Sequence, residues 1–250
     1  MSRPTGGLFG WTLAVLAMAL FCGFGVWQLD RAQQKKAMLA ESRSILAVRT
    51  PLPLRAAADP ARKTGYDWAQ GEGRFIEAPA VLLDNQTRGG RSGVRIYRVF
   101  QPDMPQPDAA AAPPLLVELG WIPLAGDRTL PLIESFSGTS RVAGLLAPPP
   151  SAGLASAIAS PQPDGNLLAT SLDPAVLSGA LKLPALAPRV LRLDPALKLG
   201  YLRDLDILPN TLPPERHLGY AVQWFGLALT VLITALVLTL RKRGRRSQAA

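Results

Sequence analysis

The sequence predicts a membrane protein in which two transmembrane α-helices flank an extracytoplasmic β-rich domain, an antiparallel sheet of α+β type that closes toward a small barrel. Two uncharged apolar runs, at residues 8–27 and 220–240, predict the helices. Apolar residues that alternate between turns rich in Gly, Pro, Asn and Asp predict the sheet. The other parts are a short N-terminus (1–7), the domain itself (28–219) with a β-rich core at about 66–194, and a basic tail (241–250).

The two apolar runs are long enough to span a bilayer. They hold twenty and twenty-one residues, and a helix that rises about 1.5 Å per residue needs roughly 20 residues to cross the hydrocarbon core. The alternative for the first run is a cleaved signal peptide. However, the run exceeds the roughly 7–15 apolar residues of such a segment, and no small-x-small cleavage site closes it. We therefore expect an uncleaved span.

Basic residues predict the orientation. The tail carries five cations directly after the second run, while Arg3 is the only charge before the first. Cations beside a span are retained in the cytoplasm, where they also meet anionic lipid. The cations that follow the first run favour the opposite orientation, but the rule weakens for long translocated loops. We expect both termini in the cytoplasm and the central domain outside it.

Composition excludes several classes of function. Six of the 27 basic residues lie in the N-terminus and the tail, so the central domain carries a net charge of only +3 and no nucleic acid partner is expected. Cys22 is the only cysteine, which excludes an internal disulfide and a Cys-based metal cluster. His217 is the only histidine, which excludes a histidine metal triad and makes a Ser-His-Asp arrangement implausible. We do not expect an enzyme.

The remaining elements follow from local patterns. Helix-forming residues at 28–46 predict that the first helix continues as an exposed basic helix until the prolines after residue 50 break it. Residues 84–85 and 89–93 are predicted turns, and residues 173–181 a short helix with Pro174 at its first position. Two segments rich in Pro and Ala, 101–114 and 147–163, are predicted flexible loops. The predicted strands are 68–75, 80–84, 94–100, 115–122, 141–146, 167–170 and 189–193.

The single histidine is the main candidate for chemistry. His217 comes three residues before the second apolar run, after two prolines, so it is expected at the outer end of the second helix. Tyr220 and Trp224, three and seven positions further on, are expected on the same helical face. A histidine beside aromatic rings fits an axial haem ligand. The alternative is a residue of an ordinary interfacial aromatic belt, which composition alone favours.

Four motifs resemble those of the Surfeit locus protein 1 family. Residues 25–31 (GVWQLDR) are similar to its G-x-W-Q-x-x-R, and residues 217–225 (HLGYAVQWF) to its H-x-G-Y-A-x-Q-W-F. Residues 83–88 (LDNQTR), followed by Gly93, and residues 116–122 (LVELGWI) resemble two strand elements of the same family. The chain departs from the family where Glu118 and Leu119 replace an expected Asn-Arg pair, and residues 148–200 show no match.

The resemblance implies an assembly factor for cytochrome c oxidase in the bacterial inner membrane. It implies that the chain receives or holds haem a, with the catalytic subunit of the oxidase, the lipid membrane and haem A synthase as partners. The alternatives are a scaffold that stabilises an oxidase intermediate without touching haem, and an extracytoplasmic sensor, which a tail without a signalling domain disfavours. The residues implied in cofactor binding are Trp27, Gln28, Arg31, His217, Tyr220, Gln223 and Trp224, with His217 as the candidate ligand of the haem iron.

Arg31 has two interpretations. It closes the first span, where its guanidinium could pair with a haem propionate. The alternative is a cation that extends along the helix to a lipid phosphate.

Overall fold

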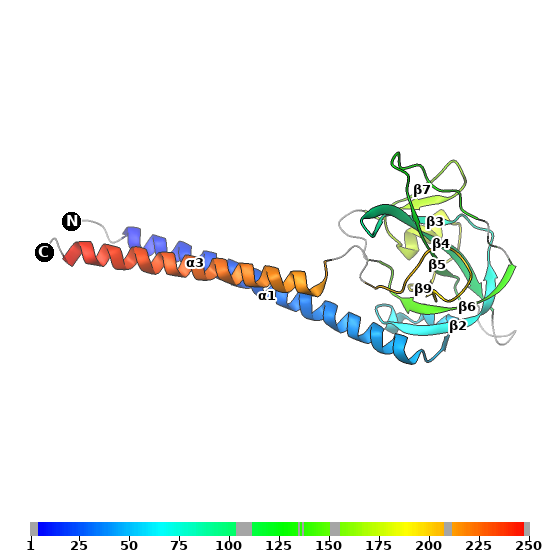
Figure 1. Cartoon of the computed structure of the whole chain (residues 1–250), viewed down its shortest axis with the longest axis horizontal. Helices are drawn as coiled ribbons and strands as arrows, with labels where there is room; N and C mark the ends of the chain where they lie inside the picture. Colours follow the sequence, from blue (N-terminus) through cyan, green and yellow to red (C-terminus); the bar gives the residue numbers. More distant parts are fainter. Residues whose placement is uncertain are drawn as a thin grey trace. The chain divides into compact units, whose positions relative to one another are not determined.

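The computed structural model describes residues 5–103, 112–134, 136, 138–150, 156–207 and 212–247. The chain separates into two compact units, one of Met1–Ala40 with Thr211–Ala250 and the other of Glu41–Asn210. We call the first unit the helix pair and the second the barrel domain. In Figure 1 the long helices α1 and α3 and the labelled strands identify the two units.

Both predicted apolar helices are present. Helix α1 spans Thr5–Val48 and helix α3 spans Pro214–Ser247. By length and composition, each contains a stretch that is apolar enough to cross a membrane. Helix α1 continues unbroken beyond its apolar run, which confirms the predicted extension to about residue 46. It ends shortly before Pro51, because proline disfavours helical backbone in the residue that precedes it.

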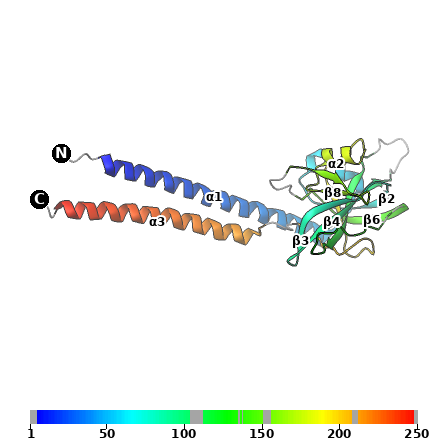
Figure 2. The same cartoon turned by 90° about the horizontal axis from the view of Figure 1, so that it is seen from above.

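The helix pair is antiparallel (Figure 2). Trp11, near the start of α1, donates its Nε1 hydrogen to Thr239 Oγ1 near the end of α3, at 3.1 Å. Along each helix, the residues that face the partner helix recur at alternating intervals of four and three positions, which is the spacing of coiled-coil seams. On this seam lie Phe21, Gly25, Gln28, Ala32 and Lys35 of α1, and His217, Ala221, Trp224 and Ala228 of α3.

In the described part of the chain, nine strands form one sheet that closes into a barrel. The strand order is β1-β2-β6-β9-β5-β4-β3-β8-β7, and an additional pairing of β2 with β4 closes a ring of five strands, β2, β6, β9, β5 and β4. This confirms the predicted small barrel. The strands are β1 Leu52–Pro53, β2 Asp67–Phe75, β3 Val81–Arg88, β4 Arg91–Pro102, β5 Leu115–Pro123, β6 Gly138–Ala147, β7 Ala159–Pro161, β8 Leu167–Ala169 and β9 Val190–Leu193.

The sheet is mixed, so the predicted antiparallel pairing is confirmed for most strand pairs and wrong for three of those in the described part of the chain. The parallel pairs are β1 with β2, β3 with β8, and β5 with β9. Parallel neighbours need a long crossover connection. The chain between β5 and β9 supplies one, since it passes through β6, β7, β8 and the short helix α2 (Pro174–Ala180) before β9 enters between β5 and β6.

One predicted turn lies inside a strand. Residues 84–85 belong to β3, where the register with β4 shifts between Leu83 and Gln86. Asn85 has a φ of 57°, a left-handed conformation that asparagine tolerates better than most residues. The pattern that predicted a turn therefore marks a β-bulge. The turn predicted at 89–93 is confirmed in its first two residues, because Gly89 and Gly90 connect β3 to β4.

The segments rich in Pro and Ala are only partly loops. Residues 101–102 complete β4, and strand β7 lies within the second segment, where it pairs with β8 at the edge of the sheet. Residues 104–111 and 151–155 lie outside the described part. The short helix is confirmed, with Asp173 as its N-cap: its Oδ1 accepts from the backbone N–H groups of Ala175 and Val176 at 2.9 and 3.0 Å.

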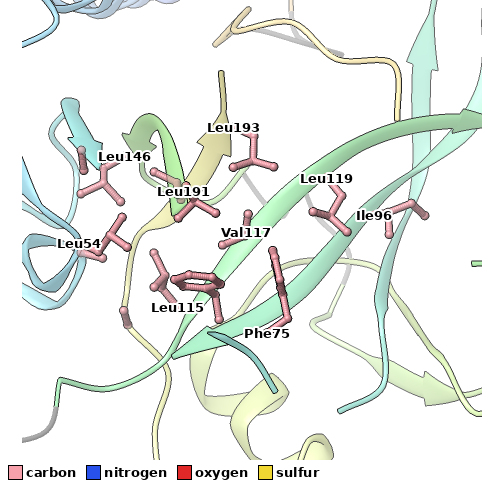
Figure 3. Close-up of a cluster of buried hydrophobic side chains, with 14 of the residues drawn as sticks. Leu54, Phe75, Ile96, Leu115, Val117, Leu119, Leu146, Leu191 and Leu193 are labelled. Atoms are coloured by element: carbon pink, nitrogen blue, oxygen red, sulfur yellow. The ribbon is translucent and has the colours of Figure 1, made fainter. Parts of the chain in front are cut away.

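Apolar side chains are buried on both faces of the barrel wall. All five strands of the ring contribute to the cluster inside, among them Phe75, Ile96, Val117, Leu146 and Leu191 (Figure 3). A second cluster covers the outside of β3, β4 and β5. It includes Val81, Tyr97, Val99, Leu116 and, from α2, Leu177. The central strands are therefore buried on both sides, and the inner cluster fills the barrel interior.

Candidate functional site

The structure joins the two end motifs of the sequence through one hydrogen bond. His217 lies in the first turn of α3, where Pro214 opens the helix, and its side chain is buried at 7% exposed. Its Nδ1 lies 2.7 Å from Oε1 of Gln28 on α1. These two residues are 189 positions apart in the chain, and the seam of the helix pair brings them together.

The two ring nitrogens of His217 have different surroundings. The direction of this contact depends on the tautomer of the ring and on which way the Gln28 amide is turned. An amide oxygen only accepts, so a neutral imidazole that donates to Gln28 Oε1 carries its proton on Nδ1. The Nε2 atom is buried and has no hydrogen-bond partner among the described residues. With the proton on Nδ1, Nε2 holds a free lone pair. That is the form in which a histidine binds a metal.

Small side chains and a lysine surround this layer of the seam. Ala32 on α1 and Ala221 on α3 are almost completely buried beside Gln28 and His217. One turn after Ala32 on α1, Lys35 Nζ donates to the backbone carbonyl of Leu212, just before α3. The prediction of an exposed basic helix is therefore wrong at Lys35. Its position seven residues after Gln28 is the sequence signal that it belongs to the seam.

Aromatic rings fill the adjacent layer. Trp224 lies against both Phe21 and Phe24 of α1, with ring centroids 5.7 and 4.8 Å apart. At Gly25 the helices approach closely, because a Cβ there would come within 2.7 Å of the Phe225 ring. Trp224 and His217 share the seam, as predicted from their spacing of seven.

The other candidate residues lie away from this seam. Trp27 is 57% exposed and lines an apolar depression on α1 together with Ala19, Leu20, Gly23 and Phe24. Arg31 is exposed, and its Nη1 donates to Gln34 Oε1 at 3.2 Å.

Tyr220 and Gln223 are also exposed, and they line a second depression on α3 with Pro213, Glu215, Arg216 and Gly219. The expectation that Tyr220 shares the face of His217 is wrong. The seam steps by four residues at this point, so Ala221 occupies the position that faces α1.

A second cluster of buried polar groups lies in the barrel wall. Glu118 on β5 pairs with Arg95 on β4 at 2.5 Å and with Arg192 on β9 at 2.9 Å, and Tyr97 donates its hydroxyl hydrogen to Glu118 at 3.3 Å. All four side chains are buried. Burial raises the pKa of the Tyr97 phenol well above its ordinary value, and the charge of Glu118 raises it further, so the phenol remains a donor.

This cluster has a structural role. Arg192 also donates to the backbone carbonyls of Asp204 and Asp206, at 3.2 and 2.5 Å, and so holds the segment after β9 against the barrel. The carboxylate of Glu118 connects the three strands β4, β5 and β9. In the described part of the chain, no three His, Cys, Asp or Glu side chains lie close enough together to hold a metal ion.

In chain order, an apolar helix comes before and another comes after a closed five-stranded barrel, and both helices are compatible by length and composition with crossing a membrane. The model of the SURF1 family matches residues 15–229, which covers most of the chain. The chain therefore belongs to the SURF1 family, which is associated with cytochrome c oxidase assembly and is a family of assembly factors rather than of catalytic enzymes. No curated protein matches the chain.

Proposed function

We propose that this protein is a membrane-embedded factor of cytochrome c oxidase assembly that holds haem a at His217 before the haem reaches the catalytic subunit. The observation that supports this proposal is the hydrogen bond between His217 Nδ1 and Gln28 Oε1, which leaves the buried Nε2 without a partner. Haem A synthase is the proposed source of the haem, and the catalytic subunit of the oxidase is its proposed acceptor.

The residues of the seam fit the chemistry of a haem site. A single axial histidine supplies one strong bond to haem iron and leaves the other axial position open, which suits a carrier that must release its cargo. Trp224 and Phe24 provide flat apolar surface two turns along the helices from His217. Arg31 lies near Gln28 on α1, and its guanidinium could form two parallel hydrogen bonds with a propionate.

Access to Nε2 requires a change in the helix pair. The atom is buried, so iron can reach it only if α1 and α3 shift on the side of Nε2 while the hydrogen bond between Nδ1 and Gln28 is kept. A shift of this kind is energetically accessible, since helix pairs in membranes are held by modest contacts and interhelical hydrogen bonds there contribute only about 0.6 kcal/mol on average. Ala32 and Ala221 add little packing area to this layer.

The same burial favours a second candidate function, a scaffold that stabilises an oxidase intermediate without binding haem. In this interpretation the pair of His217 and Gln28 is an interhelical contact that fixes the register of the two helices, as polar residues in a seam do. The open surfaces of the helices would then contact the partner subunit.

The first test concerns the haem ligand. Protein purified from cells that make haem a is expected to show haem absorption, and His217→Ala is expected to reduce haem affinity by more than about 100-fold. This loss exceeds the roughly 10–100-fold expected from removing a residue that only supports a metal ligand. The variant should still accumulate, because insertion depends on the apolar runs.

The matched control for this test is Thr239→Val. It removes the hydrogen bond from Trp11, which is likewise a side-chain contact between α1 and α3, and lies at the far end of the pair from His217. Its haem content should equal that of the wild type. An unchanged haem spectrum in the His217→Ala protein would refute the ligand role and leave the scaffold function.

The second test concerns the orientation in the membrane. We propose that both helices span the inner membrane with the termini in the cytoplasm and the barrel domain in the periplasm, because five cations follow α3's apolar run and only Arg3 precedes that of α1. A reporter that is active only outside the cytoplasm should be active when inserted near Gln106 and inactive when fused after Ala250. Activity of the C-terminal fusion would show the opposite orientation.

A further inference from the structure

We infer that Gln28 is a positioning residue that holds His217 in the tautomer with the proton on Nδ1 and the lone pair on Nε2. The inference rests on the proposed function for its purpose, since a lone pair on Nε2 is what a haem iron would bind. The tautomer itself is a property of the protein alone and can be measured without any ligand.

The seam makes the hydrogen bond specific. Gln28 and His217 lie on facing positions of α1 and α3, and the residues that flank them on the seam, Gly25, Ala32, Ala221 and Trp224, have no side-chain acceptor to offer the ring. Gln28 Oε1, at 2.7 Å, is the acceptor that Nδ1 meets. A neutral imidazole carries a single N–H, so a ring that donates from Nδ1 to Gln28 has no proton on Nε2.

The opposite tautomer fits the same surroundings poorly. With the proton on Nε2, an N–H would be buried where no acceptor lies among the described residues. The Gln28 amide would also have to turn over, so that its NH2 group donates to Nδ1 in place of the oxygen that faces the ring. A histidine side chain free in water prefers the proton on Nε2. The protein environment at Gln28 therefore reverses the ordinary preference of the ring, and this reversal is the signature to look for.

This role differs from the one that the sequence motif implied for Gln28. The resemblance placed Gln28 among the residues that bind the cofactor, whereas the structure assigns its side chain to the histidine. Partners that orient a metal-binding histidine through its other ring nitrogen usually change metal affinity about 10–100-fold when they are replaced. Gln28 is expected to act on haem in this indirect way.

The test uses the fact that the chain has one histidine. Full-length protein labelled with ¹⁵N-histidine in detergent micelles gives signals from a single imidazole ring. At about pH 9, above the ordinary histidine pKa of about 6.5, the ring is neutral and its two nitrogen shifts report the tautomer. The wild type is expected to show a protonated Nδ1 and an unprotonated Nε2.

Three variants separate positioning from a general effect on structure. Gln28→Leu keeps the approximate volume but has no acceptor, so the proton should move to Nε2. Gln28→Glu retains an acceptor oxygen and should keep the proton on Nδ1. Thr239→Val, at the distant interhelical hydrogen bond, should leave the tautomer unchanged. A wild-type ring with its proton on Nε2, or a Gln28→Leu ring that keeps it on Nδ1, would overturn the inference.

Titration with hemin connects the tautomer to binding. Gln28→Leu is expected to bind hemin about 10–100-fold more weakly than the wild type, and Gln28→Glu to bind it nearly as well. Equal hemin affinities of the wild type and Gln28→Leu, with different tautomers, would overturn the positioning role. If no form of the protein binds hemin while the tautomers behave as expected, the proposed haem function fails, and the assignment of the tautomer to Gln28 is supported.

Discussion

Replacing Glu118 with alanine is expected to lower the free energy of unfolding of the barrel domain by about 3–5 kcal/mol, the cost of removing one partner from a buried ion pair. Glu118 is 2% exposed, and its carboxylate is the shared counter-charge of Arg95 and Arg192. The variant leaves two buried guanidinium groups without it. Hydrogen exchange of the amides in β4, β5 and β9, measured on the full-length chain in detergent, reports the loss.

A matched control for Glu118→Ala removes an ion pair at the surface. Arg128 pairs with Asp84 at 2.9 Å, but its side chain is 60% exposed. Since exposed pairs contribute about 0–1 kcal/mol, Arg128→Ala should change the exchange rates little. If Glu118→Ala also changed them little, the cluster would not hold the barrel strands together.

A triple variant separates the charges from the packing. Changing Arg95 and Arg192 to methionine and Glu118 to leucine removes all three charges at once, and apolar replacement of a buried ionic cluster is often neutral or stabilising. The triple variant should therefore be more stable than Glu118→Ala. Part of the loss should remain, because Arg192 also donates to the backbone carbonyls of the segment after β9.

The helices could be predicted from the sequence, but their seam could not. Twenty uncharged residues suffice to predict a span, because the relevant property is local to the segment. The seam depends on which residues the second helix covers. Lys35 was expected to be exposed because it is charged, and it is buried because its ammonium group donates to the carbonyl of Leu212. Such a partner cannot be recognised from either helix alone.

The strands show the same division between local and non-local information. The alternation of apolar residues predicted β2, β4, β5, β6 and β9 to within a few residues, since each needs only a pleated segment with buried faces. The parallel pairing of β5 with β9 could not be predicted, because it depends on contacts between segments about 70 residues apart. Strand β7 was missed because it is short and ends at Pro161, a residue that edge strands tolerate.

The candidate site was predicted as a set of residues and not as an arrangement. The motifs named Gln28 and His217 together, yet neither motif states that the two side chains meet. Helical spacing placed Tyr220 with His217, because positions three apart on one helix are neighbours. Which of these neighbours is buried depends on the antiparallel helix α1, which covers His217 and Ala221 and leaves Tyr220 exposed.

Replacing Trp121 with alanine is expected to destabilise the barrel domain by about 3–5 kcal/mol, the usual effect of deleting a buried large aromatic side chain. The sequence predicted that Trp121 is buried, and its 5% exposure confirms this. The indole ring packs directly on Gly93 of β4, where a Cβ would lie 2.4 Å from the ring. Its Nε1 donates to the backbone carbonyl of Gln86 on β3 at 2.9 Å, so the ring of this β5 residue contacts both β3 and β4.

Two further variants identify the source of this stability. Trp121→Phe keeps much of the apolar contact with Gly93 but loses the indole N–H, so it should be destabilised less than Trp121→Ala, with about 1 kcal/mol of its loss due to the missing hydrogen bond. Trp27→Ala removes the same side chain from an exposed position on α1 and should leave the barrel unchanged. Exchange rates of the β4 and β5 amides in the full-length chain measure all three variants. Trp121→Ala should shift these rates the most, because deleting a ring packed over a glycine leaves a cavity that the neighbouring strands cannot fill without moving. If Trp121→Ala shifted the rates no more than Trp27→Ala does, Trp121 would not be part of the stabilising core.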